Sequence, residues 1–134
     1  MFVPDNYLVE VGQEIVSRFQ NYKPVFVAFW AKEQATEHGH LFIASDEITL
    51  DSIGDDYHEI GRLTNGDLDV SEVSMRIKLI PGASEMARTA LSLQRRGQGV
   101  LPCRIQIGER MLGDTAIDGG LIYPALQPAV AESR

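Results

Sequence analysis

Three histidines carry the clearest chemical potential in this sequence, because neutral imidazole is a common ligand of transition metals. His38, His40 and His58 fall within 21 consecutive residues. On an extended segment, His38 and His40 point to the same side of the backbone. Carboxylates at Asp55, Asp56 or Glu59 would then complete a metal site. Such a site supports metal-assisted hydrolysis of a nucleic acid or another substrate, with His58, Asp55 or Asp56 in a catalytic role.

The alternative is that these side chains lie on solvated surface segments. His-Gly-His is not a metal-binding spacing by itself, and the closing ligand is not specified by the sequence. In this case residues 38–40 form an exposed turn and His58 lies on the exposed face of a helix. The sequence favours this second arrangement, for which no cofactor is expected, whereas the first requires a divalent metal.

Five basic residues in the second half of the sequence form another group with chemical potential. They fall on a predicted strand and on the helix that follows it: Arg76, Lys78, Arg88, Arg95 and Arg96. If these side chains converge, they form an anion site that binds phosphate or a nucleic-acid backbone. No aromatic residue is interleaved with them, as stacking on single-stranded nucleic acid requires. The net charge of −7 also repels phosphate backbones, so nucleic-acid binding is disfavoured.

Charge is unevenly distributed along the chain. Residues 1–72 carry 4 basic and 14 acidic side chains, whereas residues 73–134 carry 8 basic and 5 acidic ones. This polarity permits head-to-tail contact between two molecules, or contact of the basic half with an anionic partner. Simple solvation of the charged helices is the favoured explanation.

The single cysteine, Cys103, is expected to be a buried core thiol. It begins an alternating run in which Cys103, Ile105 and Ile107 would share the buried face of a strand. A lone cysteine cannot form an intramolecular disulfide, which suits a reducing compartment.

Targeting signals are not evident in the sequence. Residues 1–6 lack the basic start and apolar stretch of a secretory signal. The longest purely apolar run, residues 25–31, is far shorter than the ~18 to 20 residues of a spanning helix. We therefore expect a cytoplasmic protein that does not associate with a membrane.

Apolar periodicity in the first half predicts a helix followed by two strands. Leu8 to Tyr22 shows three- and four-residue spacing, typical of a helix, with Asp5 as its N-cap and Pro24 ending it. Residues 25–31 predict a central strand that is covered on both faces. Residues 40–44 predict a strand that pairs back antiparallel through a long loop.

A second helix is expected from Ser52 to Thr64. Its apolar stripe is Ile53, Tyr57, Ile60 and Thr64, and Ser52 with Asp55 matches the acidic variant of a capping box.

The second half predicts further strands around one helix. Val73, Met75, Ile77 and Leu79 alternate with polar residues, which indicates a strand with one buried face. The remaining predictions are a helix over 83–97, a hairpin of 105–107 with 110–112 around Gly108-Glu109, a turn at 118–120 and a last strand at 121–123.

This order, α-β-β-α-β-α-β-β with a further β, predicts an α+β fold. We expect two layers, a mixed and mainly antiparallel sheet with helices packed on one face. Residues 1–123 should form a single domain, and residues 124–134 a loosely ordered C-terminal tail.

Two functions are consistent with these features. The favoured one is a small non-catalytic module that binds a protein partner or associates with itself, because the charge is polarised and the sheet should leave an edge strand open for pairing. A homodimer is the commonest closed assembly. The alternative is a metal-dependent hydrolase or nuclease that uses the histidine cluster.

Overall fold

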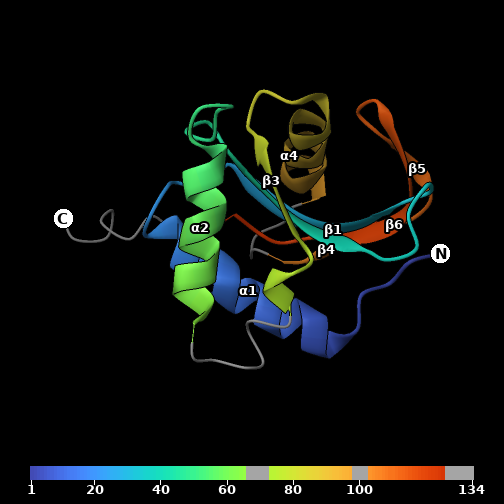
Figure 1. The fold of residues 1–134 in the computed structure, drawn as a ribbon. Coiled ribbons are helices and arrows are strands. Elements are labelled where there is room, and N and C mark those ends of the chain that lie inside the picture. The colour runs from blue at the N-terminus through green and yellow to red at the C-terminus, as the bar shows by residue number, and fades with distance from the viewer. Residues whose placement is uncertain (66–72, 98–102, 126–134) are drawn as a thin grey trace.

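The helices and strands follow the predicted order along the chain (Figure 1). The computed structural model describes residues 1–65, 73–97 and 103–125. The predicted tail therefore lies outside the described residues from 126 onward. The elements are α1 (Asn6–Gln20), β1 (Val27–Glu33), β2 (His40–Ser45), α2 (Ile53–Thr64), β3 (Ile77–Pro81), α4 (Glu85–Gly97), β4 (Ile105–Ile107), β5 (Arg110–Leu112) and β6 (Thr115–Ile122).

The six strands form one sheet in which β1 is central, as predicted. The strand order is β3-β2-β1-β6-β4, and β5 also pairs with β6. Among the strand pairs of the described residues, only β2 with β3 is parallel, and the others are antiparallel. The predicted α+β class with a mixed, mainly antiparallel sheet is therefore confirmed.

Helix placement differs from the expectation in one respect. α1 and α2 pack on one face of the sheet, against Trp30 and Leu41, whereas α4 packs on the opposite face, against Phe29 and Phe42 (Figure 1). The sheet is thus covered on both sides, and the fold has three layers instead of two. The cause is β1, in which the five consecutive residues 27–31 are apolar and buried, so that both faces of the sheet need a covering layer.

Two predictions for the C-terminal strands are wrong. β4 does not pair with β5; the hairpin is formed by β5 and β6 around Gly113-Asp114, where Gly113 has a φ of 66°. The predicted turn at 118–120 instead lies within β6, at an irregularity in its pairing with β1. Gly119 there has a φ of 136°, and a Cβ on Gly120 would lie 2.0 Å from the Trp30 carbonyl oxygen. Glycine is required here by a bulge.

Two further expectations fail because the strands start later than predicted. β3 begins at Ile77, so Met75 precedes it and is 86% exposed, although Val73 is buried. β4 begins at Ile105, and Cys103, which precedes it, is exposed. An alternating pattern places a residue on the buried face only while the chain is in the strand.

The outer edge of β3 is partly blocked against strand pairing. The Tyr57 hydroxyl of α2 accepts a hydrogen bond from the Leu79 backbone N–H at 2.9 Å. Pro81, at the end of the strand, has no N–H to offer. This edge is therefore poorly suited to the strand addition that the sequence suggested.

No helix in the described ranges combines the length and apolar character needed for a membrane span.

Candidate functional site

The predicted metal site is not assembled. Among the described residues, no three or more histidine, cysteine, aspartate or glutamate side chains are grouped so that they could hold a metal ion. His38 lies in the loop before β2, while His58 and Asp55 are exposed on α2. Asp56, the other proposed ligand, is buried in a separate network described below.

His40 lies at the start of β2, on the sheet face that carries Phe42. Its Nδ1 atom is buried and has no hydrogen-bond partner in the described structure. Burial lowers the pKa of His40, and the nearby charge of Lys78 lowers it further, so the imidazole is neutral at pH 7. Lys78 itself forms an ion pair with Glu33 at 2.9 Å.

The five basic residues proposed as an anion site are distributed over two elements. Lys78 lies on β3 and Arg76 just before it, exposed. The remaining three are exposed on α4: Arg88, Arg95 and Arg96. Because Lys78 is already engaged by Glu33, its contribution to a shared anion site would require breaking that pair. Convergence of these residues stays a prediction.

A hydrogen-bonded segment that was not predicted from the sequence connects β2 to α2. Residues 45–52 form two consecutive turns, closed by hydrogen bonds from Ile48 N–H to the Ser45 carbonyl and from Ser52 N–H to the Thr49 carbonyl, both 3.2 Å. We call this segment the double turn. Ile48 is buried between the two turns. The central residues of the turns are all exposed: Asp46, Glu47, Leu50 and Asp51.

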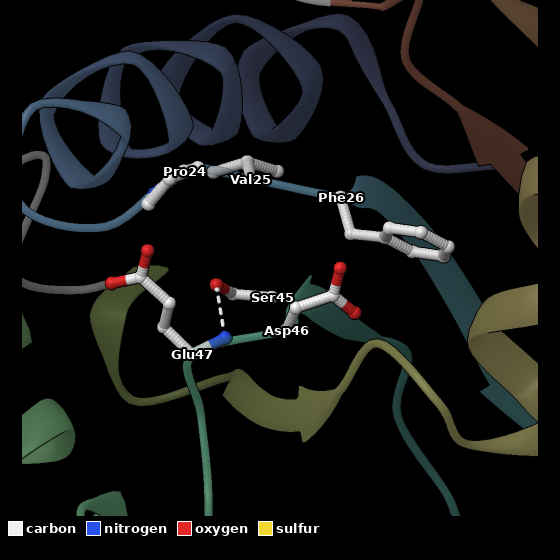
Figure 2. Close-up of a pocket in the computed structure, with 6 residues that line it drawn as sticks. All are labelled: Pro24, Val25, Phe26, Ser45, Asp46 and Glu47. Atoms are coloured by element: carbon white, nitrogen blue, oxygen red, sulfur yellow. Dashed lines mark hydrogen bonds between the residues drawn. The ribbon is translucent and has the colours of Figure 1, made fainter.

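The first turn faces an open pocket of about 270 Å³ (Figure 2). Its opposite wall is the segment Pro24–Phe26 that leads into β1. The carboxylates of Asp46 and Glu47 flank Ser45 and point toward that segment (Figure 2). Neither carboxylate has a hydrogen-bond or ion-pair partner within residues 1–65, 73–97 and 103–125. The pocket therefore combines two unneutralised negative charges with an apolar wall.

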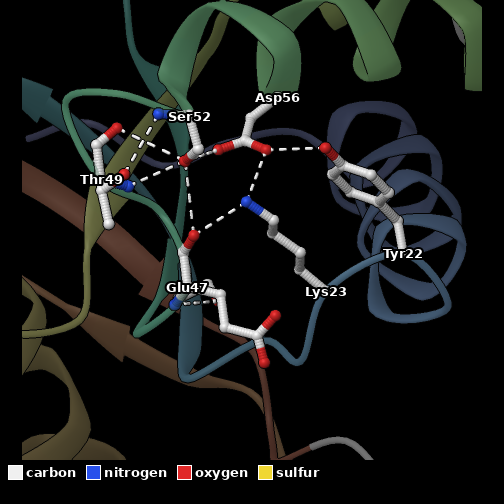
Figure 3. A network of polar contacts seen from close by, with 7 residues as sticks. Tyr22, Lys23, Glu47, Thr49, Ser52 and Asp56 are labelled. Atoms are coloured by element: carbon white, nitrogen blue, oxygen red, sulfur yellow. Dashed lines mark hydrogen bonds and ion pairs between the residues drawn. The ribbon is translucent and has the colours of Figure 1, made fainter.

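A network of polar side chains lies between the double turn, the start of α2 and the segment that follows α1 (Figure 3). Its centre is Asp56, which is 0% exposed. Asp56 accepts hydrogen bonds from the Tyr22 hydroxyl at 2.8 Å and the Ser52 hydroxyl at 2.7 Å, and it forms an ion pair with Lys23 Nζ at 2.8 Å. Tyr22 and Lys23 lie in the segment that follows α1, and Ser52 is the N-cap residue of α2. We call these four residues the Asp56 network.

The contacts within the Asp56 network shift the pKa values of Asp56 and Tyr22. Burial alone would raise the pKa of Asp56, but the hydrogen bonds from Lys23, Ser52 and Tyr22 oppose it and leave the pKa below its usual value. The hydrogen bond to Asp56, assisted by burial, raises the pKa of Tyr22 to about 12. Asp56 is therefore ionised at neutral pH and Tyr22 is not.

The same network holds the double turn in place. Lys23 Nζ also donates to the Glu47 backbone carbonyl at 2.8 Å. Ser52 Oγ accepts from the Thr49 N–H at 2.9 Å, and Thr49 Oγ1 accepts from the Ser52 N–H at 3.1 Å. Ser52 thus does not cap α2 with its side chain, contrary to the predicted capping box, because its hydroxyl is used here.

A weak sequence signal for the network did exist. Ile53, Asp56, Ile60 and Thr64 have the three- and four-residue spacing of a buried helical face, as good a match as the predicted stripe with Tyr57. Hydrophobicity favoured Tyr57, which is exposed at 41%. Asp46 and Glu47 gave no signal, since acidic residues in a loop are typical of solvated turns.

These two groups of carboxylates differ in what they can do chemically. Asp56 already accepts from three donors, and its charge is neutralised within the fold. Asp46 and Glu47 are open to solvent and are available to a cation.

No protein-family model matches this chain, and comparisons with curated proteins and with solved structures give no match either.

Proposed function

We propose that this protein is a non-catalytic binding module that receives a cationic group of a protein partner in the pocket beside the double turn. One observation carries the proposal. The carboxylates of Asp46 and Glu47 face an open pocket of about 270 Å³ and have no partner of opposite charge among the described residues. A lysine or arginine side chain can supply both the charge and an apolar stem for the wall of Val25 and Phe26.

Preorganisation of the turn supports binding at this place. Lys23 fixes the carbonyl of Glu47, and Ile48 anchors the segment in the core. A ligand therefore does not have to order the loop when it binds, which removes one of the main entropic costs of association.

The charge of the chain supports a cationic ligand. Residues 1–72, which include the double turn, carry 14 acidic and 4 basic side chains. An acidic region of this kind attracts basic surfaces and accelerates their association at low ionic strength. A second copy of the chain, offering the exposed arginines of α4, is the competing occupant, and sedimentation of the protein alone distinguishes it.

The use of Asp56 supports a role without catalysis. A general base must reach the proton that it removes, with a free lone pair at hydrogen-bonding distance. Asp56 is 0% exposed and accepts from Tyr22, Lys23 and Ser52. The burial and the contacts of Asp56 are consistent with a structural role in holding the double turn.

The experiment measures binding of fluorescent arginine-containing peptides by anisotropy. The test variant is Asp46→Asn with Glu47→Gln, and the matched control is Glu109→Gln with Asp114→Asn, which removes two exposed carboxylates elsewhere. We expect the test variant to bind about 5- to 30-fold more weakly, as for loss of two partly solvated ion pairs, at ~0.5 to 1 kcal/mol each. The control should retain wild-type affinity.

Equal losses in both double variants would show that the peptides respond only to net charge and would contradict the proposal. The absence of binding by the wild type to any basic peptide at low salt would contradict it as well.

A further inference from the structure

We infer that the ligand is a polypeptide segment that carries an apolar side chain close to its basic one, and that Leu50 is the surface this apolar side chain covers. This inference rests on the proposed function, since the basic residue occupies the Asp46–Glu47 pocket. It adds the chemical class of the partner: a peptide, as opposed to a small amine or a metal ion.

Leu50 is the most exposed large apolar side chain of the described residues, at 93%. It is a central residue of the second turn, and that turn is closed twice, by backbone and side-chain hydrogen bonds between Thr49 and Ser52. The side chain is therefore presented to solvent by a fixed backbone. Ile48, two residues earlier, is buried in the core, so the same segment has one buried and one exposed apolar side chain.

The spacing of the two turns selects an elongated ligand. Glu47 and Leu50 are three residues apart, so their Cα atoms are separated by at most ~11 Å. Leu50 is not among the residues that line the pocket, so a single amine or a bare metal ion held there by the carboxylates would leave it uncovered. An extended segment of about four residues spans that distance and offers one side chain to each turn.

The charges around Leu50 define the partner further. Glu47 precedes Leu50, and Asp51 follows it on the same turn, so acidic groups lie on both sides of the leucine in the sequence. A partner segment that is apolar but uncharged would leave these carboxylates without counter-charge as it desolvates them, which is costly. A segment with basic and apolar residues together neutralises the carboxylates and buries Leu50.

The test uses two sets of nine-residue peptides. Peptides of the first set contain one arginine and one leucine, with the leucine one to four positions to either side; in the second set serine replaces the leucine. Each is titrated into the wild type, Leu50→Ser and Met75→Ser, the last being a control at a similarly exposed apolar residue, 86%, outside the double turn.

We expect at least one arginine–leucine peptide to bind the wild type about tenfold more tightly than its serine counterpart, as for burial of one leucine side chain. Leu50→Ser should abolish that difference, and Met75→Ser should preserve it. Circular dichroism of both variants should match the wild type, because both residues are exposed.

Two results would overturn the inference, and they are distinguishable. If leucine gives no advantage, or if its advantage survives Leu50→Ser, the partner class is wrong while binding through Asp46 and Glu47 stands. If no arginine peptide of either set binds the wild type, the proposed function fails and this inference fails with it.

Discussion

Asp56 and Glu47 carry the same functional group, and Lys23 contacts both residues, yet their surroundings are opposite. At Asp56 the carboxylate itself is enclosed and accepts from three side chains. At Glu47 only the backbone carbonyl is held by Lys23, and the carboxylate projects into an open pocket (Figures 2 and 3). The charge of Asp56 is neutralised by Lys23 within the fold, whereas the charge of Glu47 has no counter-charge among the described residues.

This contrast separates stability from binding within one small region. Removing a buried, paired charge leaves its partner uncompensated, which is expensive. Removing an exposed, unpaired charge costs the fold little, so the charge is available to the ligand that we propose. The comparison predicts that substitutions in the Asp56 network affect unfolding, and that substitutions in the first turn affect association.

The largest effect is expected from Asp56→Ala. It leaves the Lys23 ammonium, only 15% exposed, without its ion-pair partner. We expect a loss of about 3 to 5 kcal/mol in the free energy of unfolding, measured by urea denaturation. A loss below about 1 kcal/mol would show that the network contributes no more than a surface pair, and the comparison would fail.

Acid should weaken the fold through the same carboxyl group. The pKa of Asp56 is lower in the folded than in the unfolded protein, so its contribution is fully present above the unfolded value of ~3.9. It is lost as the pH falls from there through the folded-state pKa. The pH dependence of the unfolding free energy should therefore be shallower in Asp56→Asn than in the wild type, and parallel curves would contradict this assignment.

A smaller loss is expected for Tyr22→Phe, which removes one donor to Asp56 and keeps the ring in place. Its hydrogen bond to a charged acceptor predicts a loss of about 1.5 kcal/mol in the free energy of unfolding. In a double-mutant cycle with Asp56→Asn, the two losses should not add, because the substitutions remove the same contact. Additive losses would show that Tyr22 stabilises the fold through contacts other than its hydrogen bond to Asp56.

The smallest effect on stability is expected for Asp46→Asn with Glu47→Gln. Both side chains are exposed, so the free energy of unfolding should change by no more than about 0.5 kcal/mol. Thermal denaturation measures this in the same samples that are used for peptide binding. A large loss of stability would mean that these carboxylates serve the fold, and the weaker binding would need another explanation.

Much of the fold was predictable because apolar periodicity is a local signal. The stripe from Leu8 to Tyr22 gave α1 with its Asp5 cap, which accepts from the Leu8 N–H at 2.9 Å. The apolar run at 25–31 gave a central strand, and the same run explains the α4 layer on the second face. The pairing of β6 was missed because Gly119-Gly120 is typical of a turn, whereas here it accommodates a bulge against Trp30.

The site was less accessible to sequence reasoning, for a physical reason. Asp56 is paired with Lys23 and Tyr22, which lie more than thirty residues earlier, just after α1, and such long-range pairing leaves no local pattern. Histidine spacing drew attention to His38, His40 and His58, which the described structure does not group around a metal site. The first turn is distinguished only by the tertiary structure, in which Asp46 and Glu47 line a pocket and their carboxylates have no partner among the described residues.

The most direct test of the central claim is an NMR titration of the ¹⁵N-labelled protein with an arginine peptide. The account predicts that amide shifts concentrate at residues 25–26 and 45–51, leave α4 unchanged, and disappear in the Asp46→Asn, Glu47→Gln variant. Shifts spread evenly over the acidic surface, or centred on another element, would contradict it.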